Sequence, residues 1–118
     1  MTFWRKNKST IDSGESDSGD FPTRPANCSL IGDSRWRHRV RVVGRIHKVR
    51  VQPWESGVVS LECTIVDATG GIDVIFLGRR QIPGIRVGKY LEVEGMVFEC
   101  REALAIMNPE YTLIPSQG

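Results

Sequence analysis

From about residue 37 to the end of the chain, short runs of β-branched residues alternate with polar residues, and glycine, proline or aspartate separates the runs. A period of two is typical of β-strands, because successive side chains of a strand point to opposite faces. Helical periodicity is nearly absent: only the connector at 78–89 has room for a helical turn, ahead of Pro83. The pattern therefore predicts an all-β domain.

The alternating runs predict five strands, at about residues 39–51, 58–67, 72–77, 90–98 and 103–107. The first strand is long, and its alternation is lost near Gly44 and again between Ile46 and Val49. It must therefore contain a β-bulge, which we place at Gly44. Five strands with a short helical turn between the third and fourth follow the order of the oligonucleotide-binding (OB) fold, an antiparallel five-stranded barrel.

The N-terminal region differs in composition from the rest of the chain. Residues 6–34 are rich in Ser, Gly, Asp, Asn, Thr and Pro, and residues 12–20 contain almost no apolar side chain. Such a segment buries too little apolar surface to offset the entropy lost on ordering. We predict a disordered tail over residues 1–34 and one OB-fold domain over residues 35–118.

A block of positive charge lies at the start of the predicted domain. Residues 35–50 contain seven Arg or Lys residues, two His residues and no Asp or Glu, although the whole chain has a formal net charge of only +2. Because the arginines alternate with valines, we expect them on the outer face of the first strand, where they would attract a polyanion. The same charges could instead protect an exposed strand edge from unwanted pairing.

Three motifs resemble a known family. They are the segment DATGGIDVIF at 67–76, a Gly88-Lys89 turn entering a strand that ends in Val-Glu-Gly at 93–95, and the segment IMNPEY at 106–111. They are similar to the OB modules of anticodon-binding domains and of a replication-fork helicase wedge domain, and most of all to small stand-alone OB-fold nucleic-acid-binding proteins of actinobacteria. The resemblance covers about residues 37–115. It implies nucleic-acid binding, although OB domains also serve as protein-interaction modules.

The resemblance also implies where a ligand would bind: across the second and third strands, between the loops that join strands one to two and four to five. Trp54 in the first of these loops could stack on a base, or it could simply cover the edge of the barrel. Ile75 and Leu77 depart from the family pattern, which often has an exposed aromatic residue there. The predicted nucleic-acid-binding residues are Arg39, Arg41, Arg45, Lys48, Arg50, Trp54, Thr64, Ile75, Leu77 and Arg101. Arg79 and Arg80 could extend this surface, or merely keep an exposed connector soluble.

The sequence contains no catalytic or metal-binding motif. It has no P-loop, no Gly-x-Ser-x-Gly elbow and no His-Glu-x-x-His motif. Cys28, Cys63 and Cys100 lie far apart, and His38 and His47 have no partner at metal-ligand spacing. We expect a protein that is not an enzyme and has neither metal nor cofactor. No apolar run suggests a signal peptide or membrane span, so we expect a cytoplasmic protein.

Two functions remain open from the sequence. In the first, the chain binds single-stranded or junction DNA, or RNA, with little sequence specificity: the first-strand cations contact phosphates and Trp54 stacks on a base. Four neutralised phosphates would give a salt slope of about −3. In the second, Trp54, Ile75 and Leu77 form an apolar patch for a protein partner, or the chain is an accessory subunit of a larger complex. DNA and RNA are not distinguished by any pattern here, and the oligomeric state is open.

Overall fold

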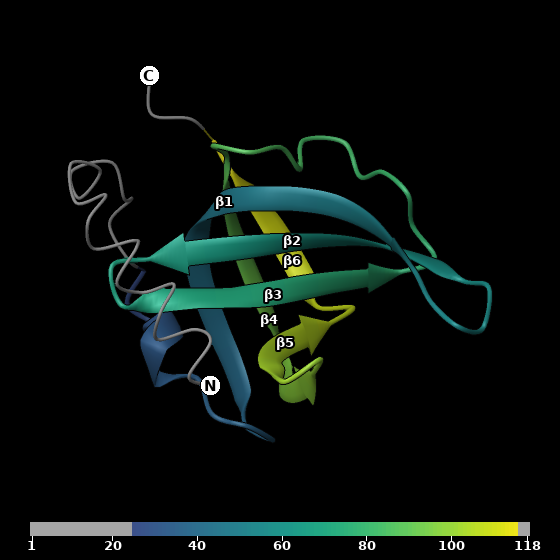
Figure 1. Cartoon of the computed structure of the whole chain (residues 1–118). Coiled ribbons are helices and arrows are strands. Elements are labelled where there is room, and N and C mark those ends of the chain that lie inside the picture. Colours follow the sequence, from purple (N-terminus) through teal and green to yellow (C-terminus); the bar gives the residue numbers. More distant parts are fainter. Residues whose placement is uncertain (1–24, 116–118) are drawn as a thin grey trace.

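The computed structural model describes residues 25–115, which form six β-strands and a short 3-10 helix, η2 (Ile31–Asp33). The strands are β1 (Arg39–Pro53), β2 (Val59–Asp67), β3 (Gly70–Leu77), β4 (Tyr90–Cys100), β5 (Ala103–Met107) and β6 (Glu110–Ile114) (Figure 1). The all-β prediction is confirmed, but this part of the chain has six strands where five were predicted. Asn108 and Pro109, which ended the last predicted strand, only separate β5 from β6. No helix within residues 25–115 is long and apolar enough to cross a membrane.

Five of these strands close into a ring. The hydrogen-bonded pairs are β1–β2, β2–β3, β3–β5, β5–β4 and β4–β1. The sheet was predicted to be antiparallel. All of these pairs are antiparallel except β3–β5, which is a short parallel pair. β6 adds to the ring by pairing with β4. In Figure 1, β1 curves around the molecule, and the β2–β3 hairpin crosses in front of β4 and β6.

β1 closes the ring because it pairs with two strands in succession. Its residues 39–45 pair with β4, and its residues 45–53 pair with β2. The register against β2 shifts between Ile46 and Lys48, so the bulge lies at His47 and the prediction of a bulge at Gly44 was wrong. The bulge lies just after β1 has changed partners, where the strand turns from one neighbour to the other.

Gly44 has a different role in β1. A Cβ atom at this residue would lie 2.7 Å from the carbonyl oxygen of Val66 and 3.0 Å from the nitrogen of the same residue. Both are backbone atoms of β2, which cannot rotate away as the end of a flexible side chain can. The two strands therefore approach this closely only because residue 44 has no side chain.

The connector between β3 and β4 contains turns and no helix. Two backbone hydrogen bonds close turns at 82–85 and 86–89. Gly84 and Gly88 have φ angles of 87° and 92°, which lie outside the right-handed helical region. The helical turn predicted here was therefore wrong. The connector still contributes to the core, because Ile82 and Ile85 are buried.

The core fills the ring and includes part of the predicted tail. Cys28 and Ile31 are buried, and the Ile31 N–H donates a hydrogen bond to Oδ2 of Asp67 at 2.8 Å. Asp67 also accepts a hydrogen bond from the N–H of Thr69, so its side chain caps the β2–β3 turn. Residues 25–34 thus pack on the sheet, whereas residues 1–24 of the predicted tail lie outside the described residues. The fully buried side chains include Val42, Ile46, Cys63, Ile65, Val74, Leu91, Val97 and Ile106.

Replacing Gly44 by alanine should lower the free energy of unfolding by about 3 kcal/mol, because the new methyl group would press on the β2 backbone. Gly57 offers a control, since a Cβ there meets nothing within 4 Å and only its φ of 89° resists a side chain. Gly57→Ala should cost about 1 kcal/mol. Urea denaturation measures both values, and equal losses would contradict the close approach at Gly44.

Candidate functional site

A polar row of β2 lies on the outer face of the ring. Ser60, Glu62 and Thr64 alternate with Leu61 and Cys63 of the core, as the sequence predicts. Polar side chains on the outer face of a strand ordinarily contact solvent, yet the exposed fractions of these three are 0%, 0% and 2%. Side chains from β1, from the β1–β2 loop and from the β4–β5 loop contact this row.

Glu62 is the centre of the polar row. Its carboxylate accepts hydrogen bonds from Nη2 of Arg50 at 3.1 Å, from Nη1 and Nη2 of Arg101 at 3.0 and 3.1 Å, and from the hydroxyl of Ser60 at 2.9 Å. Burial raises the pKa of Glu62, but the donors on Arg101 and Ser60, with the positive charges, outweigh burial and hold this pKa below its usual 4.5. The carboxylate is therefore charged at neutral pH.

Trp54 and Arg101 meet above this part of β2. Trp54 follows β1 directly, and Arg101 lies in the short loop between β4 and β5. The indole N–H of Trp54 donates to the Ser60 hydroxyl at 2.8 Å, and the guanidinium carbon of Arg101 lies 5.0 Å from the centre of the Trp54 ring. This distance is that of a cation–π contact. The two loops that flank the ligand face of an OB fold are thus joined by side-chain contacts.

The other predicted residues of this face make internal contacts. The Thr64 hydroxyl donates to Oδ1 of Asp73 at 2.6 Å. Ile75 lies opposite Glu62 on β3 and is 0% exposed. Leu77 is half-buried, and its N–H donates to Oδ1 of Asn108. The structure therefore corrects the predicted contact roles of Thr64 and Ile75: both lie on the outer face, but neighbouring side chains cover them.

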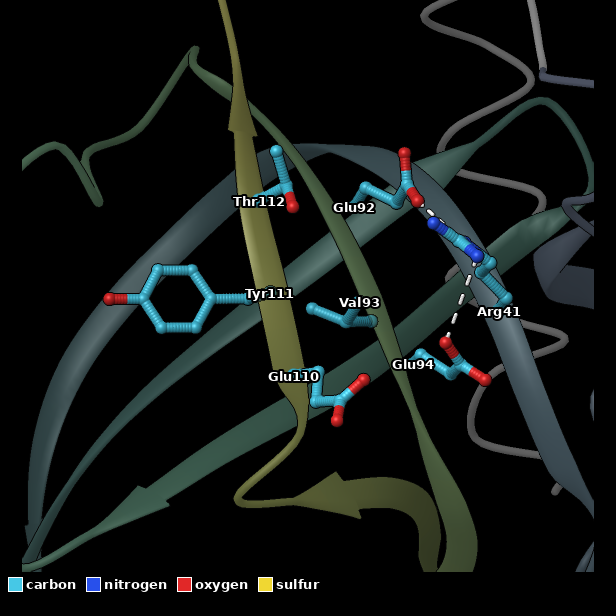
Figure 2. Close-up of a pocket in the computed structure, with 7 residues that line it drawn as sticks. All are labelled: Arg41, Glu92, Val93, Glu94, Glu110, Tyr111 and Thr112. Carbon is cyan, nitrogen blue, oxygen red and sulfur yellow. Dashed lines mark hydrogen bonds and ion pairs between the residues drawn. The ribbon is translucent and has the colours of Figure 1, made fainter.

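On the opposite side of the ring, acidic side chains neutralise two of the predicted cations. Arg41 lies between Glu92 and Glu94, at 2.6 and 3.8 Å (Figure 2). Arg39 lies 3.3 Å from Glu94. Glu110 of β6 stands directly opposite Glu94. A hollow of about 80 Å³ lies here, lined by Arg41, Glu92, Val93, Glu94, Glu110, Tyr111 and Thr112. Three carboxylates beside two guanidinium groups do not favour a polyanion.

The continuous cationic surface expected along β1 is therefore absent from the described structure. Arg50 lies 3.1 Å from Glu62 and 3.6 Å from Asp73, on the face opposite to Arg39 and Arg41. The change of pairing partner along β1 separates these arginines, and the ion pairs form with residues far away in sequence. A block of like charges in sequence could not reveal either effect.

Three exposed cations lie on or beside the Glu62 face without an ion pair to any residue of 25–115. Lys48 stands opposite Thr64 on the outer face. Arg79 and Arg80 follow β3, and the N–H of Gly78 donates to the carbonyl of Val59, which places them beside the β1–β2 loop. The remaining predicted cation, Arg45, is half-buried where β1 changes partners.

Neither metal ligands nor a reactive thiol add to this site. Within residues 25–115, no group of three or more His, Cys, Asp or Glu side chains could hold a metal ion. Cys63 is fully buried, and burial raises the pKa of its thiol to about 12. It is therefore protonated at neutral pH and serves as a small core side chain.

The role of Glu62 was not predicted from the sequence. The signal that could have revealed it is the register of the β1–β2 hairpin, which places Arg50 directly opposite Glu62. An opposite-charge pair at facing positions of two predicted strands indicates a cross-strand ion pair. The second partner, Arg101, is 39 residues from Glu62 in sequence, and no local pattern connects the two.

Comparisons with known proteins bear on the fold. No family model matches the chain, and no curated protein matches it. The solution NMR structure of a replication factor A related protein from Methanobacterium thermoautotrophicum superposes with a TM-score of 0.59 at 13% sequence identity, covering 79% of this chain and 96% of that one. At this identity the likeness concerns the fold alone. Together with the strand order, it supports an OB-type fold for this chain.

Replacing Glu62 by glutamine should lower the free energy of unfolding at pH 7 by about 1–3 kcal/mol, because charge-assisted hydrogen bonds are lost. Folding lowers the pKa of Glu62, so its stabilisation is present above the ordinary value of 4.5 and is lost as pH falls through the lower folded value. The difference in free energy of unfolding between wild type and variant, measured by urea denaturation, should therefore become smaller as pH falls below 4.5.

Glu94→Gln is the matched control for this experiment, since it removes the same charge from a more exposed ion pair. Its effect should stay within about 1 kcal/mol. If the difference in free energy of unfolding between wild type and Glu62→Gln did not change with pH, the role given to the charged carboxylate would be contradicted.

Proposed function

We propose that this chain is a small stand-alone OB-fold protein, like those of actinobacteria, that acts in the cytoplasm by binding single-stranded DNA or RNA without catalysing a reaction. The observation that supports this is the stacked pair of Trp54 and Arg101 above β2. Its two members come from the two loops that flank the ligand face of OB folds. The likeness in fold to a replication factor A related protein agrees with the proposal.

In the proposed complex, base stacking is the main source of affinity. Trp54 is half-buried, its indole N–H is fixed by Ser60, and the Arg101 guanidinium lies over its ring. Aromatic rings and guanidinium planes both stack on bases, which contributes about 1–3 kcal/mol per base. Every base has a π-face, so little sequence specificity is expected.

Phosphate contacts come from the cations that have no internal ion pair. Lys48, Arg79 and Arg80 meet this condition among the described residues on or beside this face, whereas Arg50 and Arg101 are held by Glu62. The proposed complex therefore has a modest electrostatic component. It keeps the nucleic-acid function and the stacking role of Trp54 that were predicted from the sequence, but it no longer relies on a cationic first strand.

The alternative of a protein-binding patch loses one of its three residues. That patch required Trp54, Ile75 and Leu77 to be exposed together, and Ile75 is 0% exposed. Leu77 is half-buried as well. The structure therefore favours nucleic acid over an apolar protein partner at this face.

Replacing Trp54 by alanine should weaken binding to labelled oligothymidylate by about 5- to 150-fold, measured by fluorescence anisotropy at low salt. Trp36 provides a matched control: it is 55% exposed and also has a guanidinium over its ring, that of Arg37 at 4.6 Å, but it lies beside β4. Trp36→Ala should bind like wild type. Equal losses in both variants, or no binding by wild type, would overturn the proposed function.

The affinity for oligothymidylate should fall with salt at a log–log slope of about −2, because about three phosphates are neutralised. Lys48→Gln should reduce the slope to about −1.4. Arg39→Gln removes the same charge on the acidic side and should leave the slope unchanged. A wild-type slope of −3 or steeper would mean, at about −0.7 per phosphate, that the paired arginines contact phosphate as well.

A further inference from the structure

Glu62 occupies the place where this face would otherwise bind an anion. Arg101 presents both terminal nitrogens to one carboxylate, and Arg50 adds a third N–H donor. This arrangement of donors suits a phosphate as well as a carboxylate. With Glu62 in position, these three N–H contacts are made to its carboxylate.

We infer that Glu62 is a specificity-determining residue that acts as a built-in anion: it excludes phosphate from the Arg50 and Arg101 guanidinium groups and leaves the face selective for uncharged aromatic bases. The inference rests on the proposed function and deepens it. The ligand class that follows is a single strand whose bases contact Trp54 and Arg101 while its phosphates pass along the periphery, near Lys48.

The local charge balance supports this inference. Two guanidinium groups, Arg50 and Arg101, face two carboxylates, Glu62 and Asp73, so the cluster sums to 2 − 2 = 0. A neutral cluster attracts a phosphate group only weakly. Bases carry no charge and meet no such disadvantage, because stacking depends on the ring and guanidinium planes.

The burial of Glu62 makes an exchange of anions costly. A phosphate that took over the Arg101 nitrogens would leave a carboxylate of 0% exposure short of partners, and uncompensated buried charges are strongly destabilising. The carboxylate is also held ionised, because its donors keep the pKa of Glu62 below 4.5. Glu62 therefore stays in place when a ligand arrives.

The same carboxylate positions the stacking groups. The Ser60 hydroxyl donates to Glu62 and accepts from the indole N–H of Trp54, which fixes that ring. The two-point contact with Arg101 fixes the guanidinium plane above the ring. Glu62 thus orients Trp54 and Arg101 for contact with bases. It also occupies the N–H groups of Arg50 and Arg101 that would otherwise bind phosphate.

Linear inorganic polyphosphate separates the two kinds of contact, because it carries phosphates and no bases. Wild type should bind oligothymidylate and bind polyphosphate weakly. Glu62→Gln removes the built-in anion, so it should bind polyphosphate about ten-fold more tightly than wild type, and its salt slope on oligothymidylate should steepen by about 0.7 for each phosphate gained. Glu94→Gln makes the same charge change on the other face and should behave like wild type with both probes.

An unchanged salt slope and unchanged polyphosphate binding in folded Glu62→Gln would overturn the inference and leave Glu62 a structural anchor. If wild type binds neither probe while Glu62→Gln gains polyphosphate binding, the proposed nucleic-acid function fails and the inferred anion role stands. Circular dichroism shows whether the variant is folded.

Arg101→Gln tests the inference without removing Glu62. This variant removes two of the hydrogen bonds to the buried Glu62 carboxylate, so it should lower the free energy of unfolding. Arg50 and Ser60 still donate to that carboxylate, and circular dichroism shows whether the variant is folded. If Arg101 contacts no phosphate, the variant should bind oligothymidylate more weakly with an unchanged salt slope. A slope reduced by about 0.7 would show that Arg101 contacts a phosphate, and would overturn the inference.

Discussion

The pairing of one strand with two neighbours is the constraint on which the rest of this structure depends. β1 hydrogen-bonds to β4 along its first half and to β2 along its second. The change of partner requires Gly44, whose missing side chain lets β1 approach the backbone of β2, and a bulge at His47. The change of partner also divides the outer surface of β1 into two faces, so that Arg39 and Arg50 lie in different environments.

Those two faces have different electrostatics although their arginines come from one block of sequence. On the β4 face, Arg39 and Arg41 lie among glutamates near the surface, where such pairs contribute little to stability. On the β2 face, Arg50 joins a fully buried carboxylate that also holds a residue from a distant loop. Charge density along the chain is therefore a poor guide to surface potential when a strand changes neighbours.

The period of two in the sequence was enough to predict the β class and most of the strand positions, because these depend on neighbours within a few residues. The same period did not predict β6. This strand begins at Glu110, directly after Asn108 and Pro109, which were interpreted as the end of the last strand. The period also failed for the connector, where positive φ angles at Gly84 and Gly88 give turns. Glu62 shows the same limit for the site, since its two arginine partners come from two other segments of the chain.

The short helix η2 changes where this domain begins. The N–H of Ile31 is bonded to Asp67, the N–H of Gly32 donates to the hydroxyl of Thr69, and the Ile31 side chain is part of the core. Hydrogen bonds from residues ahead of β1 thus hold the β2–β3 turn in place. A chain that starts at the compositional boundary near residue 35 would lack these hydrogen bonds. It would also have a cavity in the core at the position of the Ile31 side chain. An expression truncation that preserves the native domain needs to begin before Cys28.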